Sequence, residues 1–600
     1  MKQIGAEISR RVWKAKYRYQ QEGTIADSWR RIARALADVE TKDKAAWEQR
    51  FFGILQDFKF LPGGRIQAGA GTGRNVTLFN CFVMGSIEDS MTGIFAALEE
   101  GAITMQQGGG IGYDFSTLRP RGARAKAVGT IASGPVSFMH VWDTMCGTIL
   151  STGARRGAMM ATLRCDHPDI EEFIVAKQQP GALRRFNLSV QITDTFMTAV
   201  QQDAEWPLVF PEVVFAGKGE TILRDWPGFE EPVPCRIVGR LPARALWDRI
   251  LRATYEYAEP GVLFIDRINR LNNLWYRERI SATNPCGEIP LPPYGACDLG
   301  SINLARFVSF PFSPQARFEV KALEDTVQVA VRLLDDVIDA SRFPLSQQAE
   351  SARGTRRIGL GITGLADALL MLRLPYGTEA SLALARETMS LICHTAYRAS
   401  VALAKEKGSF PYLDRDKYLE GEFIHRLPHD IRQGIAEKGI RNSHLIAIAP
   451  TGTISLLAGN VSSGLEPIFA ASYGRKILDE SGNSEELCLT DYAIQLWREM
   501  TGNRSDFPPG FVTVNDLQVR AHLDMQATMQ PFVDNSISKT INVPEDCPFS
   551  EFREIYDLAY EKGLKGCTTF RPNPVTGAVL SGAEEGVDAP HCCVLEREAD

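Results

Sequence analysis

Several features are absent from this 600-residue chain, and each absence excludes a class of protein. No apolar run reaches the roughly 18 residues of a membrane-spanning helix, and residues 1–20 lack the apolar segment of a signal peptide. We therefore expect a cytoplasmic protein with no membrane partner. Lys and Arg number 66 against 73 Asp and Glu, and the net charge is −7. Because phosphate neutralisation needs clustered cations, we expect no nucleic-acid partner.

Cysteine is sparse, with 12 in the chain, and no two are spaced as C-x-x-C. A zinc site of the usual spacing is therefore not expected, and we predict no metal-ligating set. In a reducing compartment such cysteines are buried or catalytic more often than disulfide-bonded. The chain also lacks a repeat of 20 to 50 residues, which argues against a solenoid.

The periodicity of apolar residues divides the chain into three regions. Residues 1–60 show helical spacing, and residues 571–600 are rich in Pro, Gly, Ala and acidic residues, which is typical of a mobile tail. Between them, residues 61–570 alternate short apolar strands with helices, which predicts an α/β domain with a mainly parallel sheet or barrel. The predicted strands include LFNCFVM, FNLSVQIT, GVLFID, HLIAIAP and GFVTVN, and the long predicted helices lie near 325–341 and 380–408.

The most informative segment is Asn284-Pro285-Cys286-Gly287-Glu288, which places an amide, a thiol and a carboxylate at every second position. Pro285 favours extended backbone before it, and in extended backbone alternate side chains leave on the same side. We therefore expect a hydrogen-bonding amide, a sulfur centre and a proton acceptor to meet one small molecule.

Two further cysteines, Cys81 and Cys297, lie in or beside runs with strand character. Adjacent strands can bring two such residues within disulfide reach, so this pair could supply two electrons near Cys286. The alternative is that both are ordinary core residues. Cys592 and Cys593 lie in the predicted tail, where thiol exchange is a natural role.

Three glycine-containing segments differ in meaning. Residues 359–364 (GLGITG) match a dinucleotide fingerprint but follow no predicted strand, so we do not expect a nucleotide there. GGGIGYDF, from Gly108, suggests close backbone packing, with approach of a ligand as the alternative. HLIAIAPTGTISLLAG reads as a strand, a hydroxyl-rich turn and a helix start, which could hold a phosphate or could be a simple N-cap.

Taken together, these motifs resemble the ribonucleotide reductases, specifically the adenosylcobalamin-dependent class II enzymes. The resemblance runs through FNCFVMGSIEDSMTGIF, QQGGGIGYDFSTLRP, EPGVLFIDRIN, NPCGEIPLPPYGACDLGSINLARF, RRIGLGITGLADALL, APTGTISLLAGNVSSGLEPIF and VDNSISKTINVP. It implies a ten-stranded α/β barrel built from two halves of five parallel strands, with Cys286 at the tip of a central finger loop.

The resemblance also implies a role for each catalytic residue. Cys286 would become a thiyl radical and abstract the 3′ hydrogen of the ribose, Glu288 would accept the 3′-hydroxyl proton, and Asn284 would hold that region by hydrogen bonding. Cys81 and Cys297 would reduce the substrate radical and end as a disulfide. Substrate would be bound by Asn80, Gly108, Gly109, Gly110, Thr451, Gly452, Thr453 and Ser455.

The class is indicated by what the C-terminal region does not contain. Relatives that take a radical from a second subunit carry two adjacent tyrosines, whereas the corresponding stretch here reads GLKGCTTF and the chain has no Tyr-Tyr pair. A glycyl-radical motif is also missing. By resemblance, the radical would then come from adenosylcobalamin bound by this chain.

The remaining expectations concern control and partners. Residues 151–157, with Arg155 and Arg156, resemble a first specificity loop, and 177–186 a second; two basic surface loops are the alternative. Residues of the second loop expected to contact a dNTP or ATP effector are Lys177, Gln178, Gln179 and Arg184.

By resemblance, the enzyme would be a homodimer reduced by a thioredoxin- or glutaredoxin-type protein through Cys592 and Cys593, although adjacent cysteines are unusual in this role. Two other functions stay open: a class I-type large subunit that needs a radical-generating partner, and a catalytically silent nucleotide-binding regulator.

Overall fold

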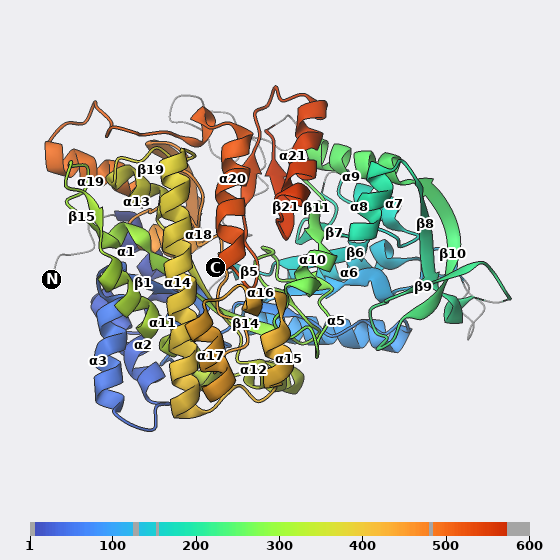
Figure 1. Ribbon diagram of the computed structural model, residues 1–600, viewed down its shortest axis with the longest axis horizontal. Coiled ribbons are helices and arrows are strands. Elements are labelled where there is room, and N and C mark those ends of the chain that lie inside the picture. The colour runs from blue at the N-terminus through green and yellow to red at the C-terminus, as the bar shows by residue number, and fades with distance from the viewer. Residues whose placement is uncertain are drawn as a thin grey trace.

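The computed structural model describes residues 7–123, 131–151, 155–179, 181–215, 217–478 and 484–572. The N-terminal helices and the long helix α14 (Glu379–Lys407) lie at one end of the molecule, and the small sheet of β8, β9 and β10 lies at the other (Figure 1). None of the described helices is both long and apolar enough to cross a membrane.

A ten-stranded sheet runs through the centre and contains a group of parallel strands. Strands β2, β3, β6, β7 and β11 pair in parallel in that order. Strand β14 flanks β2 and strand β21 flanks β11, both antiparallel, and each has its own parallel neighbour, β17 or β20. The strands are β1 (Phe60–Pro62), β2 (Cys81–Val83), β3 (Gly110–Asp114), β6 (Met159–Arg164), β7 (Phe186–Ile192), β11 (Gly261–Phe264), β14 (Ala296–Asn303), β17 (Ile358–Thr363), β20 (Thr540–Asn542) and β21 (Gly566–Phe570).

The predicted mixed α/β fold with a mainly parallel sheet is confirmed, but the predicted closed barrel is not. The paired strands of the described residues form no closed sheet. Beyond the named strands, isolated parallel bridges join Leu360 to Ile446 and Ile448 to Ile537, and residue 537 comes three positions before β20. The segment HLIAIAP thus contributes bridges rather than a full strand.

The central strands are buried because helices cover them. Every residue of β6, β14 and β17 is buried, as expected for parallel strands covered on both faces. Helix α11 (Val320–Ala340) packs on β14 and β17 and also on α14. Burial of each of its core side chains, among them Val327 and Leu334, contributes about 1.5–3 kcal/mol. The predicted helices near 325–341 and 380–408 correspond to α11 and α14.

The N-terminal region is helical, as predicted, and continues one helix further than expected. It contains α1 (Glu7–Val12), the π-helix η1 (Trp13–Tyr17), α2 (Ile25–Ala37) and α3 (Lys44–Leu55). Helix α2 begins with a capping box between Thr24 and Asp27. The stretch LPGGRIQAGAGTG that follows includes the short helix α4 (Gly64–Gly69).

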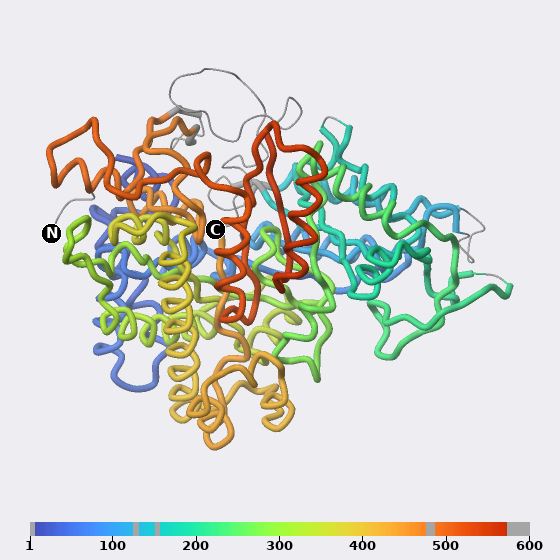
Figure 2. Tube along the Cα trace, turned by 45° about the horizontal axis from the view of Figure 1, so that its top comes forward, coloured from blue at the N-terminus to red at the C-terminus, as the bar shows by residue number. Residues whose placement is uncertain are grey.

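The other helices cover the sheet or extend the C-terminal half. Figure 2 shows α20 and α21 beside β21 in the middle of the molecule. The remaining helices are α5 (Met91–Gln106), α6 (Pro135–Thr148), α7 (Ile170–Val175), α8 (Asp194–Gln201), α9 (Ala243–Tyr257), α10 (Ile265–Arg270), α12 (Ser346–Thr355), α13 (Leu365–Met371), α15 (Arg415–Glu420), α16 (Glu422–His425), α17 (His429–Lys438), α18 (Gly452–Leu457), α19 (Tyr492–Thr501), α20 (Val519–Met529) and α21 (Phe549–Glu561).

Small sheets complete the fold. One has the order β8 (Glu205–Pro211), β10 (Val233–Pro242), β9 (Thr221–Arg224). Two-stranded pairs are β4 (Leu150–Ser151) with β5 (Arg155–Arg156), β12 (Ala282–Thr283) with β13 (Pro290–Leu291), β15 (Val308–Ser309) with β16 (Arg317–Phe318), and β18 (Ser472–Leu478) with β19 (Ser484–Thr490).

Two sequence patterns have a different structural meaning. The predicted strand GFVTVN is wrong: its end forms the 3₁₀ turn Val514–Asp516, because Asp516 accepts hydrogen bonds from the backbone and hydroxyl of Thr513. Gly359 and Gly361 of GLGITG lie in β17 itself, which follows helix α12, and Gly364 is the N-cap of α13. A Cβ at Gly361 would lie 2.3 Å from the carbonyl oxygen of Ala447, so this glycine serves close strand packing.

Candidate active site at the Cys286 hairpin

Cys286 lies in the turn of the β12–β13 hairpin. The amide of Gly287 donates to the carbonyl of Asn284 at 3.1 Å, and the amide of Asn284 donates to Ile289 at 3.2 Å. The expectation of extended backbone from Asn284 to Glu288 is therefore wrong. The chain reverses here because Gly287 adopts a φ of 84°, a left-handed conformation that glycine tolerates without strain.

Glycines of β3 let this hairpin lie directly against the central sheet. A Cβ on Gly112 would fall 1.8 Å from the carbonyl oxygen of Thr283, and one on Gly110 would fall 3.2 Å from the ring of Pro285. Any side chain at Gly112 would displace the hairpin. The close backbone packing predicted for GGGIGYDF is confirmed.

Contacts from remote segments fix the hairpin tip. Asn187, on β7, donates its side-chain amide to the carbonyl of Pro285 at 2.7 Å. The backbone amide of Ser536 donates to the carbonyl of Glu288 at 2.9 Å. The side-chain oxygen of Asn284 accepts from the amide of Ile289 at 3.0 Å, which closes the hairpin from within.

The structure brings the amide, the carboxylate and two thiols together. Cys81 on β2 is the register partner of Cys297 on β14, so the two cysteines face each other across adjacent antiparallel strands. The side-chain amide of Asn284 donates to Cys81 Sγ at 3.1 Å, and Cys81 Sγ lies 3.9 Å from Glu288 Oε1. Cys81, Cys286 and Cys297 form no disulfide, and Cys81 and Cys297 are buried whereas Cys286 is half-buried.

Burial determines the protonation of these groups. Desolvation raises the pKa of Glu288 to about 7, and the same cause raises the pKa of Cys81 and of Cys297 well above that of an exposed thiol. Glu288 can therefore exchange a proton near neutral pH, and the two buried cysteines stay protonated there. Such thiols can deliver hydrogen rather than act as thiolate nucleophiles.

Two buried polar groups beside the thiols have unused hydrogen-bonding capacity. Neither side-chain atom of Asn80, the residue before Cys81, has a hydrogen-bond partner, and Glu288 Oε2 also lacks one. Both residues are almost fully buried. Because buried polar groups are normally satisfied, these atoms are suited to contact a polar ligand.

The hydroxyl-rich start of α18, with Thr451 as its N-cap and Thr453 and Ser455 within the helix, is partly engaged within the protein. Thr451 Oγ1 accepts from the amide of Gly464 at 2.9 Å, and Thr451 itself has a φ of 55°. Ser455 Oγ donates to the carbonyl of Gly452 at 2.9 Å. Thr453 Oγ1 accepts from Lys16 Nζ at 3.2 Å. Of the three hydroxyls expected to face an anion, that of Thr453 is the one in contact with a cation.

Small residues occupy neighbouring positions on three strands that include β7, the strand of Asn187. Ser189 and Asn187 are two positions apart on β7 and share a face. A Cβ at Gly261 on β11 would lie 3.3 Å from Ser189 Oγ and 3.2 Å from Thr568 Oγ1 on β21. Thr568 is exposed although β21 has a strand on each side. Small residues thus lie side by side on β7, β11 and β21, with Ser189 buried and Thr568 exposed.

The other predicted site residues lie apart from this cluster. Lys177 Nζ donates to the carbonyl of Phe186 and to Glu259, which ties it to the protein, whereas Gln179 and Arg184 are exposed and Gln178 is half-buried. Arg155 and Arg156 form β5. Cys592 and Cys593 lie outside the described residues. No metal-binding group of three or more His, Cys, Asp or Glu occurs in the described part of the chain.

Sequence reasoning missed four residues around the site: Asn187, Ser536, Lys16 and Arg65. A Cβ on Gly108 would lie 2.8 Å from the guanidinium carbon of Arg65. These residues come from segments far from positions 284–288, so no local spacing could indicate their contacts. The one available signal was that FNLSVQIT carries polar residues on one face of a strand.

Comparison with known proteins gives consistent matches over almost the whole chain. Residues 79–570 match the family model "Ribonucleotide reductase, barrel domain", and residues 6–75 match "Ribonucleotide reductase, all-alpha domain". A protein of Mycobacterium tuberculosis (strain H37Rv) named "Vitamin B12-dependent ribonucleoside-diphosphate reductase" is 38% identical over 582 residues, covering 94% of this chain and 76% of its own. A protein of the same name from Thermoplasma acidophilum is 36% identical, covering 92% of this chain and 69% of its own.

Proposed function

This chain belongs to the ribonucleotide reductase family, and we propose that it reduces ribonucleoside diphosphates to 2′-deoxyribonucleoside diphosphates for DNA synthesis, with adenosylcobalamin as cofactor. The observation that carries this function is the convergence of Cys81, Cys297, Asn284 and Glu288 at the hairpin of Cys286.

The proposed chemistry assigns each residue one task. A thiyl radical on Cys286 takes the 3′ hydrogen of the ribose while Glu288 accepts the 3′-hydroxyl proton, and Asn284 orients the substrate through its amide. The 2′-hydroxyl leaves as water, and Cys81 and Cys297 supply two electrons and two protons. Cys286 then returns its hydrogen to C3′. Ribonucleotide and dithiol are thus converted to deoxyribonucleotide, disulfide and water. General base catalysis of this kind contributes typically about 10²- to 10⁴-fold.

The residues beside the hairpin fit a bulky cofactor. Ser189, Gly261 and Thr568 are small residues on the strands next to Asn187, whose side chain donates to the carbonyl of Pro285, and Cys286 is only half-buried. When bound, adenosylcobalamin supplies an organic radical, a chemistry that amino-acid side chains lack. This chain's part is to hold the group on these strands and to keep the Cys286 thiol within its reach.

For substrate, we propose binding by the unpaired amide of Asn80 and by the segments on either side of the hairpin. The glycine segment supplies Gly108, Gly109 and Gly110, and the N-cap and start of α18 supply Thr451, Gly452, Thr453 and Ser455. The unused hydrogen-bonding capacity of Asn80 and Glu288 supports a polar ligand between them.

We further propose that the sheet closes into a ten-stranded barrel around the hairpin. The bridges from Leu360 to Ile446 and from Ile448 to Ile537 support this, since Ile537 leads directly into β20. We propose that the chain has three parts: residues 1–60 form a helical region, residues 61–570 form the barrel domain and residues 571–600 form a tail.

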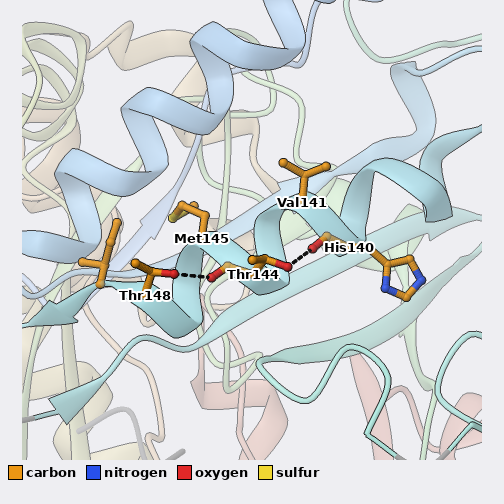
Figure 3. A pocket seen from close by; sticks show the side chains of 6 residues that line it. His140, Val141, Thr144, Met145 and Thr148 are labelled. Carbon is orange, nitrogen blue, oxygen red and sulfur yellow. Dashed lines mark hydrogen bonds between the residues drawn. The ribbon is translucent and has the colours of Figure 1, made fainter.

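A homodimer would form through α5 and α6. On α5, Met91 is 59% exposed and Phe95 49% exposed, and both are large apolar side chains. Figure 3 shows an open hollow along α6, where the hydroxyls of Thr144 and Thr148 donate to carbonyls of the same helix. The hollow thus presents mainly carbon atoms, which suits an apolar partner surface. It is lined by His140, Val141, Thr144, Met145, Thr148 and Ile149.

Two further roles are proposed from family resemblance. The loops at 151–157 and 177–186 would bind a dNTP or ATP effector near the dimer face and adjust substrate choice, with Arg184 and Gln179 exposed for this contact. In the cytoplasm, a thioredoxin- or glutaredoxin-type protein would reduce the Cys81–Cys297 disulfide through Cys592 and Cys593.

The test is anaerobic turnover of the purified protein with a ribonucleoside diphosphate and a dithiol, with adenosylcobalamin present or omitted. We expect deoxynucleotide only with the cofactor, and none from Cys286→Ser, which keeps its fold; Cys488→Ser, at an exposed site, is the matched control. Activity that needs a second protein and ignores the cofactor would instead identify a class I-type subunit. Nucleotide binding without any turnover would identify a silent regulator.

A further inference from the structure

The N-terminal helices reach the segment proposed to hold the substrate phosphates. Helix α1 packs on α18, and Ser9 donates to the carbonyl of Leu456 at 3.4 Å. The π-helix η1 follows directly and carries Lys16, whose ammonium donates to Thr453 Oγ1 at 3.2 Å. Thr453 is fully buried in this arrangement. The ammonium group of Lys16, from the N-terminal region, thus contacts the hydroxyl of Thr453, which is remote in sequence.

The position of Lys16 is fixed by its neighbours in η1. Trp13 donates its indole N–H to Ser28 at 2.8 Å, and the carbonyl of Tyr17 accepts from Arg31 at 3.2 Å. Both aromatic residues are buried, while Lys14 in the same turn is exposed. Single π-helical turns such as this one occur frequently at functional sites, where they redirect one side chain.

From this geometry we propose that Lys16 binds the substrate's diphosphate together with Thr453. This inference rests on the proposed function and adds a residue from outside the barrel domain. The start of α18 at residues 451–455 offers hydroxyl and amide groups, whereas a diphosphate carries several negative charges. An ammonium group at the same hydroxyl supplies a charge-assisted hydrogen bond, which is roughly twice as strong as a neutral one. The N-terminal helices would thereby form one wall of the substrate site.

The alternative is that Lys16 only attaches the N-terminal helices to α18. Two substitutions separate the roles. Lys16→Gln retains an N–H donor for Thr453 and removes the charge, whereas Lys16→Arg retains the charge. Lys14→Gln, in the same helix, removes an equal charge from an exposed position.

The experiment measures binding without turnover, using a nucleoside diphosphate and its parent nucleoside on the full chain, followed by KM and kcat. We expect Lys16→Gln to weaken diphosphate binding and raise KM by about 10- to 100-fold, as for a lost hydrogen bond to a charged group, with kcat within about threefold and nucleoside binding unchanged. Lys16→Arg should recover most of the affinity, and Lys14→Gln should match wild type. Should Lys16→Gln bind the diphosphate as tightly as wild type, or lose diphosphate and nucleoside equally, Lys16 is structural and the inference is wrong. Absence of binding and turnover in the wild-type protein would instead overturn the proposed function.

Discussion

Glu288→Gln offers a quantitative test of how deeply the hairpin is desolvated. Burial raises the pKa of Glu288 from 4.5 to about 7, which corresponds to about 3 kcal/mol of unfavourable free energy when the carboxylate is ionised in the folded protein. Below pH 4.5 both folded and unfolded states are protonated and this cost is absent. As pH rises through that value, the unfolded state loses its proton first, so the wild-type protein loses stability until the folded carboxylate ionises near pH 7.

Glutamine does not titrate and therefore escapes this cost. As pH rises from about 5 to about 8.5, the unfolding free energy of Glu288→Gln should therefore increase by about 2–3 kcal/mol relative to that of wild type. For a chain of 600 residues melting as one unit, that gain is about 2 °C in melting temperature. The assay is a pair of thermal melts under reducing conditions at each pH. The control is Glu437→Gln, which removes an exposed carboxylate. A difference in melting temperature between Glu288→Gln and wild type that stays constant with pH would refute the desolvation argument.

The same carboxylate should give activity an acidic limb, with kcat/KM of the wild type rising with pH through about 7 and Glu288→Gln losing about 10²- to 10⁴-fold. Phe95→Glu should convert the dimer to a monomer by placing a charge in the α5 face, as measured by sedimentation, while Val238→Glu, also exposed but on β10, should leave the assembly unchanged. A monomeric wild-type protein, or a dimeric Phe95→Glu, would contradict the proposed interface. Gly261→Val should weaken adenosylcobalamin binding, followed by the cofactor's absorption spectrum, and leave nucleotide binding intact; Gly239→Val, at an open position on β10, is the control. Equal cofactor binding by both glycine variants would remove the face of β7, β11 and β21 from the proposal.

Periodicity was sufficient to predict the elements that depend on local burial. Helices α11 and α14 and strands β2, β7 and β11 lie where the apolar pattern indicates, because each buries a continuous face. GFVTVN shows the limit of such patterns. Its alternation is typical of a strand, but two side-chain hydrogen bonds from Thr513 to Asp516 stabilise a turn instead.

The site was predictable in its residue types and not in its backbone. Cys81 and Cys297 could be paired because strand character restricts where their side chains point, and the register of β2 and β14 agrees. The conformation at Cys286 could not be predicted, since the extended form favoured by Pro285 competes with a turn that Gly287 permits. Contacts with Asn187 and Ser536, both remote in sequence, accompany the turn.

The burial that makes the thiol pair chemically suitable also creates a problem of access. Cys81 and Cys297 remain protonated because they are fully desolvated, and the same desolvation prevents an external protein from reaching their sulfur atoms. Cys286 differs, because it is only half-buried. A radical can therefore be generated on the accessible sulfur, whereas reduction of the buried pair needs a carrier thin enough to enter. A thiol pair carried by this chain, as proposed for Cys592 and Cys593, would meet this need without an external protein entering the site.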